Sequence, residues 1–292
     1  MRRIVQHVRR AATLLGELLS ESARPCPLCR TPSRGMQLPP HAGAALPVDA
    51  PLFDICRACA SDIPWIDSIA CTVCGRPETC GDCARRRNAH FVCSRSAVRY
   101  SDRVREWVAL FKYRGDERLA GPLADMLDLS FLRLELTLRG RVAGSRWDAV
   151  VPVPVSDERL AERGFNQAER LAALLCARRG LPMRRLLLRT RHSEKKSLQS
   201  RLARLKSAEG LFVADDEAVR AWIEELLGRE LASLSADRPA RRVRRPVRLL
   251  LVDDIYTTGS TIEACSEAIA AALRRHWPGS DLRVYAVTLA RS

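Results

Sequence analysis

Near the carboxyl end of the chain, two carboxylates precede a loop that is rich in hydroxyl groups, an arrangement that indicates a ligand-binding site. The carboxylates are Asp253 and Asp254, and the loop comprises Thr257, Thr258, Gly259, Ser260 and Thr261. Hydroxyl and backbone N–H groups bind phosphate oxygens, and glycine lets the backbone approach a ligand closely. The two carboxylates can accept hydrogen bonds from vicinal hydroxyls. A phosphate site beside a diol site indicates a ribose 5-phosphate.

A buried strand and a helix are expected to position this loop. The apolar residues 249–252 precede the acids, and an apolar run of this kind predicts a parallel strand that is covered on both faces. Apolar residues at helical spacing follow from Ile262 to Leu273, and Pro278 and Gly279 end the helix. The helix dipole at the loop then favours an anion. The competing interpretation is an ordinary acidic turn, but packing gives no reason for the acids and the hydroxyl loop to be adjacent.

Four Cys-x-x-Cys pairs occupy the amino-terminal part of the chain, within 58 residues. Each pair places two thiolates on one side of a tight turn, and eight thiolates suffice for two structural Cys₄ zinc sites. Redox-active pairs are the alternative, but so many pairs in so short a stretch favour zinc. Consecutive pairs predict one site from the first four cysteines and one from the last four, and an interleaved pairing also fits the sequence. The predicted ligands are Cys26, Cys29, Cys56, Cys59, Cys71, Cys74, Cys80 and Cys83.

The chain of 292 residues has a formal net charge of +15, carried almost wholly by arginine. This charge favours phosphate-bearing partners such as nucleic acid, and an arginine-rich composition without such a partner is the alternative. Residues 3–20 predict a short basic amphipathic helix; Glu17 interrupts its apolar part, which argues against a signal peptide. No window has the ~20 apolar residues of a membrane span. These features predict a cytoplasmic protein.

Strand and helix patterns alternate after His90 and predict an α/β fold with a doubly wound, mainly parallel sheet. Ligands of such sheets bind beyond the carboxyl ends of the strands, where the hydroxyl loop is expected. The predicted domains are an amino-terminal helix at 1–22, a cysteine-rich module at 23–90 and an α/β domain at 91–292. The last contains a helical, arginine-rich insertion at about 215–245.

Three motifs behind the cysteine pairs together resemble the ComF/GntX family. They are Val-Pro-Val-Pro at 151–154, Glu-Arg-Gly-Phe-Asn-Gln-Ala at 162–168 and Val-Asp-Asp-x-x-Thr-Thr-Gly at 252–259. The third motif is similar to the signature with which type I phosphoribosyltransferases bind phosphoribosyl pyrophosphate (PRPP). The resemblance covers residues 26–290 and implies a type I phosphoribosyltransferase fold behind a double zinc-ribbon module. Members are bacterial and are associated with competence, the handling of imported single-stranded DNA.

The resemblance also implies roles for individual residues. The loop from Thr257 to Thr261 would hold the 5-phosphate, Asp253 and Asp254 the ribose hydroxyls, and Mg²⁺ would arrive with PRPP, bridging pyrophosphate oxygens. Residues 185–206 correspond to a hood that closes over pyrophosphate, with a solvated basic helix face as the alternative. No catalytic base is assigned, because displacement at C1 needs positioning and charge stabilisation more than a nucleophilic side chain. Further candidates for contacts with pyrophosphate or single-stranded DNA are Arg163, Lys195 and Lys196.

Two functions follow from these observations, and both require PRPP binding. In the first, the chain is a phosphoribosyltransferase that transfers a pentosyl group to an unidentified acceptor. In the second, it is a non-catalytic PRPP sensor whose zinc ribbons and arginines bind single-stranded DNA or a helicase-like competence protein. Aromatic residues make up 5% of the chain, which weakens a stacking platform for single strands.

Overall fold

The computed structural model describes residues 24–33, 54–85, 89–113, 115–139, 146–190, 210–232 and 245–292. The chain divides into two compact units, Met1–Ile63 and Pro64–Ser292. The predicted amino-terminal helix, the predicted candidates Lys195 and Lys196, and the arginine-rich end of the predicted insertion at 233–244 lie outside the described residues. The domain boundaries predicted after residues 22 and 90 stay predictions.

The described part of the smaller unit consists of a short hairpin and one helix. Strand β1 (Arg24–Pro25) pairs antiparallel with β2 (Pro32–Ser33), and α2 spans Arg57–Asp62. The backbone N–H of Arg30 donates to the carbonyl of Cys26 at 2.7 Å, which closes the turn between the strands. The tight turn and the amino terminus of α2 each carry one Cys-x-x-Cys pair.

The larger unit is built on a four-stranded sheet in the order β3–β8–β7–β4, in which every neighbouring pair is parallel. A separate antiparallel hairpin is formed by β5 (Leu187–Arg189) and β6 (Phe212–Ala214). The predicted α/β fold with a mainly parallel sheet is confirmed. The sheet strands are β3 (Cys93–Arg99), β4 (Ala149–Pro152), β7 (Val247–Tyr256) and β8 (Leu282–Arg291).

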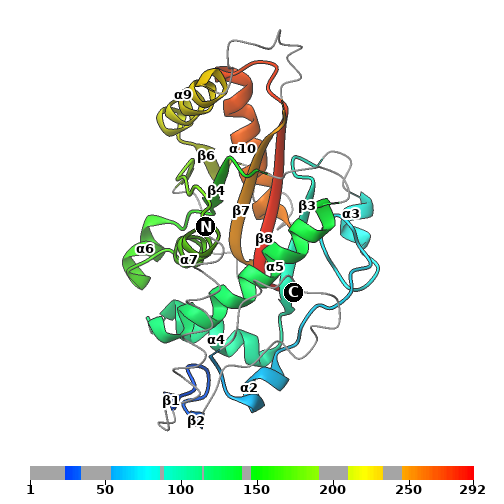
Figure 1. Ribbon diagram of the computed structural model, residues 1–292, viewed down its shortest axis with the longest axis vertical. Coiled ribbons are helices and arrows are strands. Elements are labelled where there is room, and N and C mark those ends of the chain that lie inside the picture. Colours follow the sequence, from blue (N-terminus) through cyan, green and yellow to red (C-terminus); the bar gives the residue numbers. More distant parts are fainter. Residues whose placement is uncertain are drawn as a thin grey trace. The chain divides into compact units, whose positions relative to one another are not determined.

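Helices cover both faces of the sheet (Figure 1). Successive strand residues face opposite sides, so Leu249 and Leu251 pack in one core with α10, whereas Leu250 and Val252 face the layer formed by α5 and α7. All four side chains are buried, as the apolar run predicts. The helices are α3 (Gly81–Arg85), α4 (Asp102–Tyr113), α5 (Ala120–Arg139), α6 (Asp157–Arg163), α7 (Gln167–Arg179), α9 (Asp216–Ala232) and α10 (Ser260–His276), and the 3₁₀ turn Glu117–Leu119 precedes α5.

No helix within the described ranges is both long enough and apolar enough to cross a membrane.

Candidate functional site

The acid pair lies where strand β7 runs past its neighbour β4. Pro152, the last residue of β4, pairs with Val252, so Asp253 and Asp254 project beyond the end of that strand. On the other side β8 continues to pair with β7, since Asp253 is opposite Thr288. The sequence predicts that the strand ends before the acids, but it continues through them to Tyr256, because β8 supplies the hydrogen bonds there. The acids therefore stand at an open step in the edge of the sheet.

The hydroxyl loop leads directly into helix α10. Gly259 is the N-cap residue and has a φ of 82°, a left-handed conformation that favours glycine. It has no side chain to cap the helix, so the first N–H groups of α10 are left to a ligand. The Thr258 hydroxyl donates to the Ser260 hydroxyl at 3.2 Å, and the carbonyl of Thr257 accepts from the Arg291 guanidinium at 3.3 Å. The loop has the geometry of an anion site at a helix amino terminus.

The two carboxylates lie in different electrostatic surroundings. Burial and then the charge of Asp254 raise the pKa of Asp253 well above its usual value, although its carboxylate accepts the N–H of Asp254 at 2.9 Å. Asp254 forms an ion pair with Lys112 at the end of α4, and the two side chains are 16% and 17% exposed. Lys112 is a site residue that the sequence did not single out, since only the fold brings α4 to the acid pair.

A second cation approaches the acid pair from the β5–β6 hairpin, which packs against α10. The guanidinium of Arg189 lies 5.4 Å from the ring centroid of Phe212, and its Nε is buried without a hydrogen-bond partner in the described structure. Burial and the charge of Arg159 lower the pKa of Arg189, whereas the charge of Asp253 opposes that shift. Arg189 therefore lies within electrostatic range of both Asp253 and a residue of α6.

Arg163, a predicted candidate, lies at the end of α6 and is held by neighbouring helices. Its guanidinium donates to Gln167 Oε1 at 2.8 Å and to the Tyr113 hydroxyl at 3.2 Å, and it lies 4.9 Å from the centroid of the Tyr113 ring. Tyr113 follows Lys112 in α4, so Arg163 contacts the residue next to the lysine that pairs with Asp254. Because its Nη atoms already have partners, Arg163 orders α4 against α6 and α7 in this structure.

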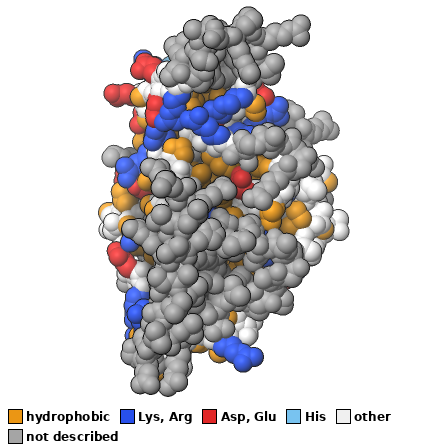
Figure 2. Space-filling view, in the orientation of Figure 1, with side chains coloured by type: hydrophobic (Ala, Val, Ile, Leu, Met, Phe, Trp, Pro, Cys, Tyr) orange, Lys and Arg blue, Asp and Glu red, His pale blue; other side chains and the backbone are white. Residues whose placement is uncertain are grey.

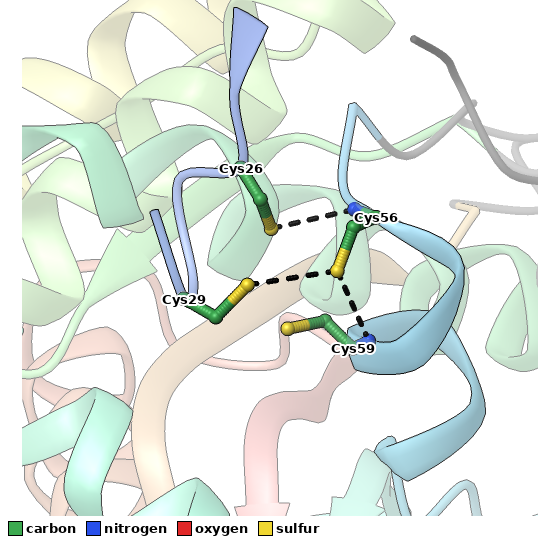
Figure 3. Close-up of side chains that lie close together, drawn as sticks. All are labelled: Cys26, Cys29, Cys56 and Cys59. Atoms are coloured by element: carbon green, nitrogen blue, oxygen red, sulfur yellow. Dashed lines mark hydrogen bonds between the residues drawn. The ribbon is translucent and has the colours of Figure 1, made fainter. Parts of the chain in front are cut away.

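The first cysteine group brings together Cys26, Cys29, Cys56 and Cys59 (Figure 3). Two thiols come from the turn between β1 and β2 and two from the start of α2, and all four point toward one another. The sulfur atoms of Cys29 and Cys56 are 3.6 Å apart. Tetrahedral zinc with Zn–S bonds of about 2.3 Å requires sulfur atoms about 3.8 Å apart, so the donor set fits this metal.

The second group consists of Cys71, Cys74, Cys80 and Cys83, with sulfur atoms of Cys74 and Cys80 3.5 Å apart. Within each group every sulfur lies within 4.8 Å of the others. The structure thus selects the consecutive pairing over the interleaved one. Among the described residues both groups offer four thiols and no other donor, which suits a structural zinc site rather than a catalytic one.

The electrostatics of the thiols also favour a cation. Burial, followed by the neighbouring thiols, raises the pKa of Cys59 and of Cys83. In contrast, hydrogen bonds from Thr31 lower the pKa of Cys29 to about 6. Four crowded, partly buried sulfurs are costly to ionise together without a metal, and zinc binding would stabilise the thiolates.

A separate basic cleft lies at the opposite end of the sheet from the acid pair. A cavity of about 570 Å³ is lined by Arg146, Trp147, Arg229 and the turn Gly180, Leu181 and Pro182. These residues precede β4 or follow α7, so the cleft opens at the amino ends of the strands. Figure 2 shows a band of Lys and Arg side chains in the upper part of the view, beside hydrophobic side chains.

The parallel sheet flanked by helices and the cysteine groups define an α/β protein with two Cys₄ groups that fit structural zinc. No protein-family profile matches the sequence. The chain is similar to the competence protein ComFC of Bacillus subtilis (strain 168), with 27% identity over 224 residues that cover 74% of this chain and 77% of the relative. It is also similar to ComFC of Streptococcus pneumoniae (strain ATCC BAA-255 / R6), with 26% identity over 222 residues, or 75% of this chain and 82% of the relative. Together with the two Cys₄ groups, these similarities confirm the resemblance to the ComF/GntX family.

Proposed function

We propose that this chain is a cytoplasmic competence protein of the ComF type that binds PRPP together with Mg²⁺. The observation that carries the proposal is the juxtaposition of the acid pair with the uncapped amino terminus of α10. The names of the two relatives support the role in competence. The site residues that follow are part of the same proposal.

Each part of PRPP has a matching group at the carboxyl end of β7. The 5-phosphate binds the N–H groups and hydroxyls of Thr257, Thr258, Gly259, Ser260 and Thr261, where the helix dipole is favourable. Asp253 and Asp254 accept the 2- and 3-hydroxyls of the ribose. Mg²⁺ would arrive with PRPP and would neutralise part of the charge of its pyrophosphate.

If the protein is an enzyme, it transfers the phosphoribosyl group to an acceptor. The bond between C1 and the pyrophosphate oxygen breaks, the pyrophosphate leaves with its electron pair, and a nucleophilic atom of the acceptor bonds to C1. The protein's contribution is to orient the ribose and to stabilise charge, because the site has carboxylates and cations but needs no covalent nucleophile. Without turnover, the same contacts would make the protein a PRPP sensor.

Binding of single-stranded DNA is a second candidate function, and the basic cleft at the amino ends of the strands favours it. Arg146 and Arg229 line a cleft together with Trp147, Leu181 and Pro182, and such a mixture of cationic and apolar side chains suits a phosphodiester backbone with bases. The test is a gel shift with single-stranded DNA at several salt concentrations, using wild type and the double variant Arg146→Ser, Arg229→Ser. Loss of binding in the variant at moderate salt supports the candidate. Equal, weak binding by wild type and variant that disappears above low salt would show that only the net charge of the protein attracts DNA, and would contradict the candidate.

Calorimetric titration of PRPP with Mg²⁺ tests the main proposal. We expect Asp254→Ala to weaken binding about 10- to 100-fold, because charge-assisted hydrogen bonds to the ribose are lost. Glu217→Ala, which removes an exposed carboxylate from α9, is the matched control and should bind as wild type does. Equal affinity in wild type and Asp254→Ala, or absence of binding in both, contradicts the proposal.

A pyrophosphate-release screen separates the enzyme from the sensor. The protein is incubated with PRPP, Mg²⁺ and a series of nucleobases and related acceptors. Acceptor-dependent release that is lost in Asp254→Ala indicates transfer. Tight PRPP binding without release for any acceptor favours the sensor.

A further inference from the structure

Lys112 and Asp254 form a mostly buried ion pair that links helix α4 to strand β7. Removing two charges from water is costly, and a buried ion pair often contributes little or nothing to stability when compared with apolar residues of similar volume. Stability alone is therefore a weak reason for a lysine at the end of an otherwise apolar helix face that includes Val104, Trp107 and Phe111. The position of the pair at the open step of the sheet points to a ligand.

An ammonium group has three hydrogen-bond donors, and Asp254 is the one carboxylate with which Lys112 pairs among the described residues. Donors therefore remain for a ligand anion without breaking the contact with Asp254. The ion pair also fixes the position of the Asp254 carboxylate at the open step, where a ribose hydroxyl would donate to it.

The covalent structure of PRPP determines which of its two anionic groups, the pyrophosphate or the 5-phosphate, would contact the Lys112 ammonium. In PRPP the pyrophosphate is attached to C1, which adjoins the C2 that carries one of the hydroxyls. A cation bonded to the carboxylate that accepts the C2 hydroxyl therefore lies beside the C1 substituent, so the contact requires that Asp254 binds this hydroxyl. The 5-phosphate lies at the other end of the sugar, where the α10 terminus provides its own donors.

Arg189 supplies a second positive charge on the Asp253 side of the pair. Its Nε is buried and has no hydrogen-bond partner among the described residues, and the charges of Asp253 and Arg159 act on its guanidinium. Two cations from separate elements, α4 and β5, thus border two carboxylates. A site that bound a neutral diol alone would not need both.

We propose that Lys112 is a ligand-binding residue of this site, which positions Asp254 for the ribose and contacts the pyrophosphate of PRPP. The inference rests on the proposed PRPP binding. It assigns Lys112 to the part of the ligand that distinguishes PRPP from ribose 5-phosphate.

The test is the ratio of the affinities for PRPP with Mg²⁺ and for ribose 5-phosphate, measured by calorimetry on the full chain. Lys112→Met removes the charge and keeps the length of the side chain. Lys112→Arg keeps the charge. The matched control is Arg105→Met, which removes an exposed cation from the same helix, where it pairs only with Asp102 at 3.2 Å among the described acids. Thermal unfolding of each variant checks the fold, and Lys112→Gln replaces Lys112→Met if the latter does not fold.

We expect Lys112→Met to lower the ratio about 10-fold or more, because a charge-assisted contact to pyrophosphate is lost, whereas the other two variants stay within about threefold of wild type. A merely structural lysine would lower both affinities together and leave the ratio unchanged, which overturns the inference. An equal fall of the ratio in Lys112→Arg overturns it as well, because then charge is not what matters. If wild type binds neither ligand, the proposed function itself fails; if wild type binds PRPP and the ratio is insensitive to Lys112, only this inference fails.

Discussion

Gly259 allows the chain to pass from β7 into α10 through a loop of three residues, 257–259. Its φ of 82° lies in the left-handed region, where a Cβ atom would be too close to the following carbonyl. The position also leaves the start of α10 uncapped, because a serine or aspartate at this N-cap would occupy the N–H groups with its own side chain. Gly259 thus both allows the left-handed backbone conformation and leaves the N–H groups of α10 available to an anion.

Replacement of Gly259 by alanine should lower the free energy of unfolding by about 1–2 kcal/mol and weaken PRPP binding, because the loop must adopt a strained conformation or move. Denaturant titration and calorimetry measure the two effects. Gly228 in α9 provides the control, since a Cβ there meets open space and alanine is the better helix former. Gly228→Ala should leave PRPP binding unchanged and raise stability by up to about 1 kcal/mol. Equal effects of the two substitutions would contradict this account of Gly259.

The second cysteine group is joined to the edge strand of the sheet. The N–H of Ser94 in β3 donates to the carbonyl of Val73 at 2.7 Å, and the guanidinium of Arg95 donates to the carbonyl of Thr72 at 3.0 Å. A Cβ at Gly75 would lie 2.8 Å from the Ser94 carbonyl oxygen, so the turn packs against the strand with no space for a side chain at this position. Zinc at this group would therefore stabilise β3, and with it the sheet.

Loss of the second zinc should destabilise the larger unit more than loss of the first. The paired variants are Cys80→Ser with Cys83→Ser, and Cys26→Ser with Cys29→Ser. Each should lower bound zinc from two ions per chain to one, because each group holds a single ion. Thermal unfolding of the sheet should shift down clearly in the first variant and little in the second, since the first group belongs to the other unit. Equal shifts would contradict the structural assignment.

The elements follow the sequence closely where local patterns determine them. The buried run at 249–252, the helix that Gly180 ends and the strand that begins at Cys93 are all present. The pairing of Lys112 with Asp254 was not predictable, because it depends on how two distant elements pack. The continuation of β7 through the acids depends likewise on β8, and the choice between cysteine pairings depends on the path of the chain between the turns. Local patterns determine elements, and tertiary contacts determine which side chains meet.

The whole molecule consists of two units that divide after Ile63, with one cysteine group in each. The site residues from α4, β5, β7 and α10 all belong to the larger unit. Its core is continuous, since Cys74 and Phe91 pack in the same cluster as Leu249 and Leu251. The larger unit therefore contains all the residues named for the proposed ligand site and all four cysteines of the second group.

A chain restricted to Pro64–Ser292 should fold, bind one zinc ion and retain the PRPP affinity of the full chain, because both the site and the second cysteine group lie within it. Circular dichroism, metal analysis and calorimetry on this shorter chain measure the three properties. An unfolded shorter chain, or one that folds but no longer binds PRPP while the full chain does, would show that the smaller unit is part of the site.

Phosphorus NMR of PRPP with Mg²⁺, titrated with the full chain, tests the central claim most directly, because it observes each phosphate of the ligand separately. We predict a saturable change of the 5-phosphate resonance, as that group enters the loop from Thr257 to Thr261, together with a change of the pyrophosphate resonances near Lys112. A 5-phosphate resonance that stays unchanged with the protein in excess would contradict this claim.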